Sequence, residues 1–273
     1  PAIAAPPTLL QSPLLLPAGA TIIVRDPQFL VKSIAGVSAL SRQLIEIARA
    51  GFTEAVVVAE PVEGLAERVR ADLARAGHAI GLRFGSIEDG GRGVIVDGAI
   101  VKAAALEQLS RPSDPVSALC LGSRIVARRM DRQDAVELAS AGFWSASGLA
   151  DDQVAVIGAG DAIVLEAPAE AARIVLRGTA KASDGIVSRH LNRPISRLLS
   201  GWLLRWDGMR PGHATVLTGL TGAAMFFSLA YGTPISLAIG CLLFHAASVV
   251  DGLDGEIARA TYRTSRLGAV LDT

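Results

Sequence analysis

Residues 214–259 read ATVLTGLTGAAMFFSLAYGTPISLAIGCLLFHAASVVDGLDGEIAR, and this stretch decides the fold. Residues 214–250 contain no Asp, Glu, Lys or Arg, and His245 is their one histidine. The apolar spans 214–231 and 234–250 are split by a Gly-Thr-Pro turn, and as helices each would reach about 25–27 Å. This length is close to the ~30 Å hydrocarbon core of a bilayer. The sequence therefore predicts a membrane hairpin.

Basic residues flank this hairpin on both sides, which predicts that both of its ends are cytoplasmic. Residues 183–200 form an amphipathic segment in which an arginine recurs every fourth position. One interpretation is a helix that lies on the membrane surface with these arginines near lipid phosphates; the other is a linker helix with a solvated face. The flanking arginines are Arg189, Arg193, Arg197, Arg205 and Arg210 before the hairpin, and Arg259, Arg263 and Arg266 after it.

The chain ahead of this segment alternates short apolar runs with helical patterns. Such alternation predicts an α/β fold, with a Rossmann-type sheet covered by helices. We expect a leader at 1–20, an α/β domain at 21–180, a juxtamembrane amphipathic helix at 181–210 and an α-helical membrane region at 211–273. The expected strands are 21–24, 55–59, 93–96, 119–127, 154–157 and 162–165, and the expected helices are 38–50, 63–76, 103–109 and 168–181.

The bulk composition excludes some functions and partners. Lys plus Arg and Asp plus Glu number 26 each, whereas a nucleic-acid-binding protein should show a basic excess. Cys120 and Cys241 are too few for a disulfide framework and suit a reducing cytosol. The opening residues 1–11 lack the basic region of a secretory signal.

Acidic and small residues gather where the second apolar span ends. On a helix, Asp251, Asp254, Gly255 and Ala258 fall within one face about 100° wide. Gly268 and Asp272 would form a matching face on a following helix. Three converging carboxylates repel one another unless a hard divalent cation lies between them. An Asp-x-x-Asp pair alone could instead cap a helix or pair with a neighbouring arginine.

The full string Asp-x2-Asp-Gly-x2-Ala-Arg-x8-Gly-x3-Asp resembles the signature of the CDP-alcohol phosphotransferases, at seven of its eight positions. The eighth, an Asp, would be the third residue beyond Thr273, so we expect that the chain is truncated within the motif. Pro211 and Thr215 resemble the family's Pro-Asn-x-x-Thr entry to its first membrane helix, with Gly212 in place of Asn. The resemblance implies the first two to three helices of the family's membrane bundle.

In that family, residues at these positions hold a CDP-alcohol and its metal ions. The resemblance implies that Asp251, Asp254 and Asp272 bind two Mg²⁺ or Mn²⁺ ions that clamp the diphosphate, while an acceptor hydroxyl attacks the β-phosphorus and expels CMP. The fourth Asp is the family's proposed general base, so no catalytic base is expected within this chain. The implied substrate-binding residues are Gly255, Ala258, Arg259, Ser265, Gly268 and Thr215.

The segment 181–196 is similar to the domain juncture of archaeal and bacterial di-myo-inositol phosphate phosphate synthases, which carry a nucleotidyltransferase domain ahead of the membrane part. Residues 29–44 are similar to the start of sugar nucleotidyltransferases. Those enzymes carry a Gly-rich phosphate loop and a lysine ahead of this region. In this chain the corresponding residues 16–28 contain one glycine and have Gln28 at the lysine position. Asp97 is one isolated acid, and residues 158–161 are read as a turn. We expect a degenerate, nucleotidyltransferase-like cytoplasmic domain.

The favoured function is a multi-pass enzyme of a bacterial or archaeal inner membrane, which takes a CDP-alcohol donor and an alcohol or polyol-phosphate acceptor. Its expected partners are the lipid bilayer and, as the family implies, a second copy in a homodimer; nucleic acid is not expected. One alternative is a membrane-tethered, non-catalytic protein that binds a nucleotide or sugar phosphate. Another is an active nucleotidyltransferase with a passive anchor.

Overall fold

The computed structural model describes residues 19–87, 93–111, 115–130, 149–158, 160–164, 168–179, 185–186, 188–206 and 208–264. The strands are β1 (Gly19–Ile23), β2 (Ser33–Ile34), β3 (Val37–Ser38), β4 (Glu54–Val58), β5 (Gly81–Gly85), β6 (Gly93–Asp97), β7 (Ala99–Val101), β8 (Ala118–Leu121), β9 (Arg124–Met130), β10 (Val154–Val156) and β11 (Ala162–Val164). The α-helices are α1 (Gln28–Val31), α2 (Ala39–Arg49), α3 (Leu65–Arg75), α4 (Ala103–Ser110), α6 (Pro168–Arg177), α7 (Arg193–Leu203), α8 (Pro211–Tyr231) and α9 (Pro234–Ala260).

Seven of these strands form one mixed sheet in the order β10-β8-β9-β6-β1-β4-β5. Strand β1 is parallel to β4 and β6, whereas β9 is antiparallel to both β6 and β8. The predicted α/β class, followed by two apolar helices, is thus confirmed. The predicted single strand 119–127 was wrong, because Gly122 turns the chain with a φ of 63° and splits the run into β8 and β9.

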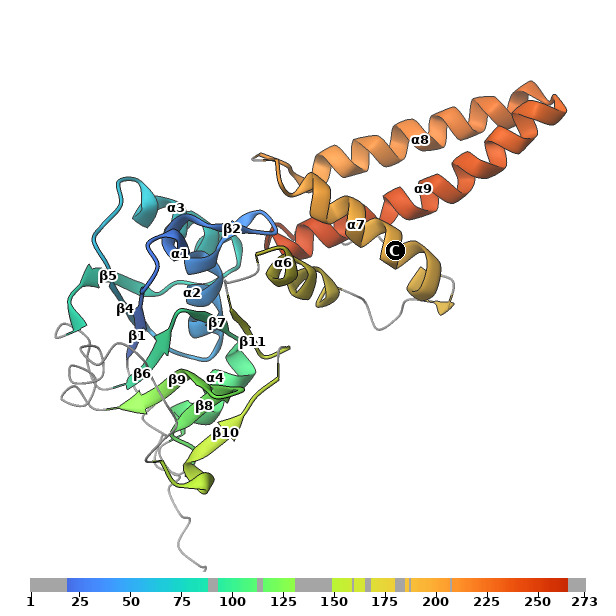
Figure 1. Ribbon diagram of the computed structural model, residues 1–273. Helices are drawn as coiled ribbons and strands as arrows, with labels where there is room; N and C mark the ends of the chain where they lie inside the picture. Colours follow the sequence, from blue (N-terminus) through green and yellow to red (C-terminus); the bar gives the residue numbers. More distant parts are fainter. Residues whose placement is uncertain are drawn as a thin grey trace, which may run out of the picture.

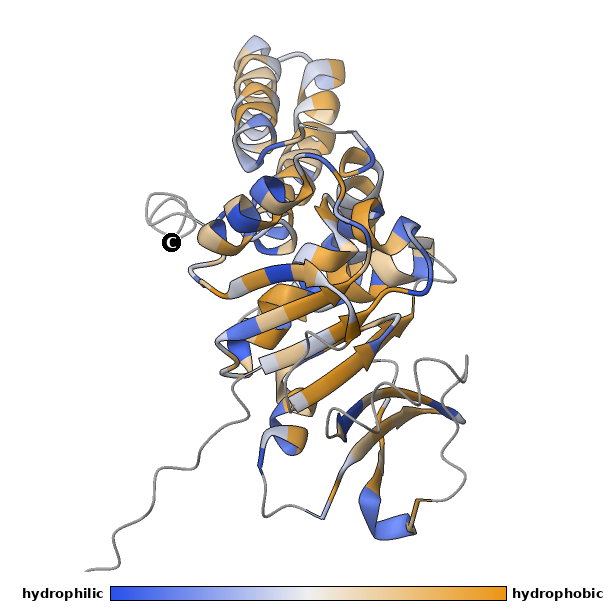
Figure 2. Ribbon diagram, turned by 90° about the vertical axis from the view of Figure 1, so that its left-hand side faces the viewer, coloured by the Kyte–Doolittle hydropathy of each residue, from blue (hydrophilic) through white to orange (hydrophobic). Residues whose placement is uncertain are grey.

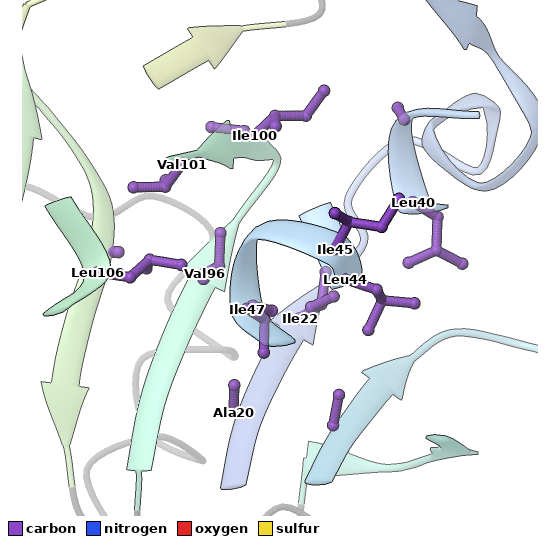
Figure 3. Close-up of a cluster of buried hydrophobic side chains, with 14 of the residues drawn as sticks. Ala20, Ile22, Leu40, Leu44, Ile45, Ile47, Val96, Ile100, Val101 and Leu106 are labelled. Atoms are coloured by element: carbon purple, nitrogen blue, oxygen red, sulfur yellow. The ribbon is translucent and has the colours of Figure 1, made fainter. Parts of the chain in front are cut away.

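The core of the α/β domain lies where α2 covers the sheet. Figure 3 shows Leu44 and Ile47 of α2 beside Ile22 of β1, with Val96 and Leu106 completing the cluster. All five side chains are fully buried. Burial of one aliphatic side chain of this size stabilises a fold by about 1.5–3 kcal/mol. This packing explains why the helical spacing of apolar residues in 38–50 correctly indicated a covering helix.

Arg42 joins the α/β domain to the end of α9. Although buried, its guanidinium donates hydrogen bonds to the carbonyl oxygens of Ile34 at 2.8 Å and of Ala260 at 2.7 Å. Loss of hydration on burial lowers the pKa of Arg42, while the neighbouring Tyr262 raises it. The carbonyl of Ala260 belongs to the last turn of α9, where helix carbonyls lack partners within the helix. The arginine therefore fixes α9 against α2.

Helices α8 and α9 leave the α/β domain as a long antiparallel pair, with α7 packed across α9 near its base (Figure 1). Both are long and apolar enough to cross a membrane. In the most apolar 18-residue stretch of each helix, only 6% (α8) and 11% (α9) is buried, whereas a core helix of a soluble protein would be mostly covered. Figure 2 shows this pair largely in hydrophobic colours. The pair fits a membrane-embedded region, as the sequence predicted.

Candidate active site

The signature acids lie on the last turns of α9, which continues as one helix from the apolar span through Ala260. Asp251 and Asp254 are one turn apart, and both belong to described residues. Asp251 is exposed, and Asp254 is half-buried. The hairpin turn between α8 and α9 returns α9 beside the first turns of α8, so that the signature lies next to Thr215.

Thr215 and Asp254 are in direct contact. The Thr215 hydroxyl donates a hydrogen bond to Asp254 Oδ2 at 3.2 Å, and the amide of Gly255 donates to Asp254 Oδ1 at 2.5 Å. The two hydrogen bonds fix the direction of the Asp254 carboxylate. The resemblance to the family signature predicted that Thr215 and Asp254 belong to one site, although they are 39 positions apart. The structure brings them together through the hairpin.

Arg259 lies beside Gly255 on the same helix. A Cβ added at Gly255 would come within 2.9 Å of Arg259 Nη1, so a larger residue would displace the guanidinium from this place. Arg259 Nε donates a hydrogen bond to the carbonyl of Thr179, just after α6, at 2.8 Å. The motif arginine thus connects the signature helix to the α/β domain. Ala258 lies on the same turn and is half-buried.

Glu256 is a residue of this region that the sequence analysis missed. Its side chain is fully buried and pairs with Arg193 Nη1 at 3.1 Å. It also accepts hydrogen bonds from Ser196 Oγ at 2.7 Å and Ser200 Oγ at 2.8 Å. The spacing of Arg193, Ser196 and Ser200 places them on one face of α7. This polar stripe was the signal that could have revealed a buried partner.

This network corrects the expectation for Arg193. We expected Arg189, Arg193 and Arg197 to share a face near lipid phosphates, but Arg193 is buried against α9 because Glu256 provides its counter-charge. Arg189 is exposed. Ser265, Gly268 and Asp272 lie outside the described residues. Within the described residues, no group of three or more His, Cys, Asp or Glu side chains is placed to hold a metal ion.

Asp97, the isolated acid of the α/β domain, is almost completely buried at the end of β6. Arg25 Nε lies 2.8 Å from each of its carboxylate oxygens, which makes a close ion pair across the ends of β1 and β6. A carboxylate that ligates a metal must direct its lone pairs at the ion. In this structure both oxygens of Asp97 are directed at an arginine.

Comparisons with known proteins agree with the motif. The family model described as CDP-alcohol phosphatidyltransferase matches residues 210–273. A protein of Thermococcus kodakarensis named "Bifunctional IPC transferase and DIPP synthase" is 41% identical over 104 residues, which are 38% of this chain and 23% of that protein. Proteins of the same name from Aquifex aeolicus (47% over 91 residues; 33% and 20%) and Rubrobacter xylanophilus (41% over 99 residues; 36% and 22%) also match.

The matched regions span about a fifth of the length of these curated relatives. They confirm the resemblance drawn from the signature, including the likeness to the di-myo-inositol phosphate phosphate synthases. The structure independently brings Asp254 of that signature together with Thr215 of the entry motif. At the C-terminus of this chain, therefore, residues 210–273 match the family model described as CDP-alcohol phosphatidyltransferase, in agreement with the signature.

Proposed function

We propose that the protein transfers a substituted phosphate group from a CDP-alcohol to an acceptor alcohol and releases CMP, at the cytosolic rim of a cell membrane. The observation that carries this proposal is the contact between Asp254 and Thr215, which joins the two parts of the family motif in one site. The match of the family model to residues 210–273 supports it.

The donor set suits a hard divalent cation, Mg²⁺ or Mn²⁺. Asp251 and Asp254 present carboxylate oxygens one helical turn apart, and hydrogen bonds from Thr215 and Gly255 already orient the second. Oxygen ligands are those that these ions prefer. Such ions, when bound, would stabilise the charge on a diphosphate. We propose Asp251, Asp254 and Asp272 as the ligands.

The remaining motif residues are proposed to position the nucleotide. Thr215 holds the Asp254 carboxylate and offers a hydroxyl at the entry to α8. The Arg259 guanidinium, a delocalised fork suited to phosphate oxygens, lies over Gly255. A nucleotide that approaches at Gly255 and Ala258 would therefore meet this guanidinium first. Ser265 and Gly268 are proposed to contribute from the following segment.

The exposed apolar surface supports a membrane location for this site. In addition to α8 and α9, the segment around α7 exposes large apolar side chains such as Ile186 and Leu198. A helix with such a face binds at the boundary of headgroups and acyl chains. We propose a multi-pass protein of a bacterial or archaeal inner membrane, with the α/β domain in the cytoplasm. A homodimer is proposed from the family alone.

For the acceptor, we propose a polyol phosphate. The matched relatives are named for IPC transferase and DIPP synthase activities, and their likeness covers 38% and 33% of this chain. The donor alcohol is proposed to be a polyol or diacylglycerol. The alternative, a membrane-tethered protein that binds a nucleotide without catalysis, is distinguished from the enzyme by whether CMP is released.

Removal of divalent metal should abolish this activity. We expect the protein encoded by the complete gene, assayed in detergent, to release CMP from at least one of CDP-inositol, CDP-glycerol and CDP-diacylglycerol. Inositol phosphate and glycerol phosphate serve as acceptors. EDTA should stop CMP release, and Mg²⁺ or Mn²⁺ should restore it, because uncompensated carboxylates would repel the diphosphate. CMP release that EDTA leaves unchanged would contradict the metal assignment, and no release from any pair would favour the binding protein.

We further propose that the α/β domain is a scaffold without nucleotidyltransferase activity. The ion pair between Arg25 and Asp97 supports this, since it occupies the one candidate metal-binding acid of the domain. We expect no pyrophosphate release when the protein is given CTP, Mg²⁺ and inositol phosphate or a sugar phosphate. Arg25→Ala should not create that activity, because the Gly-rich loop and its lysine are also absent. Pyrophosphate release by the unmodified protein would show that the domain is an enzyme.

A further inference from the structure

A cavity of about 430 Å³ lies where the α/β domain meets the end of α9. This volume is within the range of sites that hold small ligands, about 300–1,000 Å³. Its charged lining consists of Arg42, Glu46, Arg49, Arg75, Lys102 and Arg259. These side chains come from α2, α3, the start of α4 and α9, so both the α/β domain and the end of α9 contribute to the cavity. Five of the six are basic.

The one acidic side chain is already engaged. Glu46 Oε1 pairs with Arg49 at 3.1 Å, and Glu46 Oε2 accepts a hydrogen bond from the amide of Ala103 at 2.9 Å. Arg42 is held by backbone carbonyls, and Arg75 pairs with Asp72 outside the cavity lining. For the Lys102 ammonium, the described part of the chain provides no hydrogen bond or ion pair. The lining therefore has an excess of positive charge.

The cations near this cavity oppose one another. Burial, and next the positive charge of Arg263, lower the pKa of Arg75. The charge of Arg49 likewise contributes to the lowered pKa of the neighbouring Arg42. Repulsion of this kind is relieved when an anion enters and pairs with several cations at once. The electrostatic environment thus favours a multiply charged anion.

One wall of the cavity is apolar, because Ile100 of β7 and Ile163 of β11 are paired in register there. Ile100, Ile163, Ile174 and Val175 line it, and the Tyr262 ring lies under the Arg49 guanidinium at 5.1 Å. A bare inorganic anion would leave this wall without a partner, whereas an organic group attached to the anion would cover it. The two walls together match a ligand with one charged end and one organic end.

We propose that this cavity binds a phosphate monoester, with its phosphate against Arg49, Arg75 and Lys102 and its organic part against the isoleucine wall. This site is distinct from the carboxylates Asp251 and Asp254. It is lined from both sides of the domain junction, so a bound phosphate ester holds the α/β domain against α9 and limits the movement of Arg259. The ester is supplied either by a soluble metabolite or by a lipid headgroup.

Binding is tested on the chain in detergent by calorimetry and by thermal unfolding. Glucose 6-phosphate and glycerol 3-phosphate probe a soluble ester, with glucose and glycerol as neutral counterparts. Phosphatidylcholine vesicles with and without phosphatidic acid probe a lipid ester. We expect the phosphorylated compounds to bind and to raise Tm, and the neutral counterparts to do neither. Binding to phosphatidic acid alone would assign the site to a lipid headgroup.

The variants Lys102→Gln and Arg75→Gln each remove one cation of the lining. Each should weaken binding about tenfold or more, since each removes a hydrogen bond to a charged group. Arg70→Gln, on the exposed side of α3, is the matched control and should bind as the unmodified chain does. Asp254→Asn should also bind normally, which separates this site from the proposed catalytic one. Equal affinity in the Lys102 and Arg75 variants, or no binding of any phosphate ester, would overturn the proposal.

Discussion

Asp254→Asn should lower the rate of CMP release by roughly a thousandfold in the protein encoded by the complete gene, since the transition state loses several kcal/mol of charge stabilisation. The change is nearly isosteric. The amide oxygen of Asn can still accept the hydrogen bond from Thr215, so the contact between α8 and α9 should persist. What is lost is the negative charge that the proposed cation requires. The effect should therefore lie in catalysis and in metal affinity and leave folding unchanged.

Three measurements make this expectation decisive. CMP release gives the rate, calorimetric titration with Mn²⁺ gives the metal affinity, and thermal unfolding shows whether the fold is kept. Asp152→Asn, an exposed acid of the α/β domain, is the matched control and should leave all three unchanged. If Asp254→Asn turned over at the normal rate, Asp254 would not be a metal ligand.

Glu256→Ala should destabilise the protein by about 3–5 kcal/mol, the usual cost of removing one partner of a buried ion pair. Arg193, whose side chain is buried, would lose the carboxylate of Glu256. The hydroxyls of Ser196 and Ser200 would lose the same acceptor. For a protein of this size we expect Tm, measured in detergent, to fall by on the order of 10 °C. Helix α7 should separate from α9 first, because this network is its polar attachment.

A double substitution tests the physical reason. Arg193→Met combined with Glu256→Met removes both charges and fills the space with apolar groups, so it should recover much of the lost stability. Glu63→Ala, at an exposed position before α3, is the control and should change Tm little. A fall in Tm for Glu256→Ala no larger than that of Glu63→Ala would show that the buried pair does not hold α7 in place.

Several features were predictable because their signals are local. Three patterns among neighbouring residues indicated elements that the structure contains. The two apolar spans correspond to α8 and α9, the helical spacing in 38–50 to α2, and the β-branched run at 55–59 to β4. Four strands of the described residues were not predicted, namely the two-residue strands β2 and β3, and β5 and β7. Strand β5 (Gly81–Gly85) is bounded by glycines and carries an arginine, and β7 has only three residues. These strands form because neighbouring strands pair with them, and the pairing cannot be recognised from a short segment of sequence.

By itself, the sequence determined that an α/β domain precedes an apolar hairpin, and that acidic and small residues follow the hairpin in a family signature. Periodicity and composition specify such features because they depend on residues close together in the chain. Only the tertiary structure decided that Thr215 bonds Asp254, that Glu256 pairs with Arg193, and that the cationic cavity lies at the domain junction. Those contacts join residues 39, 63 and more positions apart, and their partners are chosen by packing of whole helices.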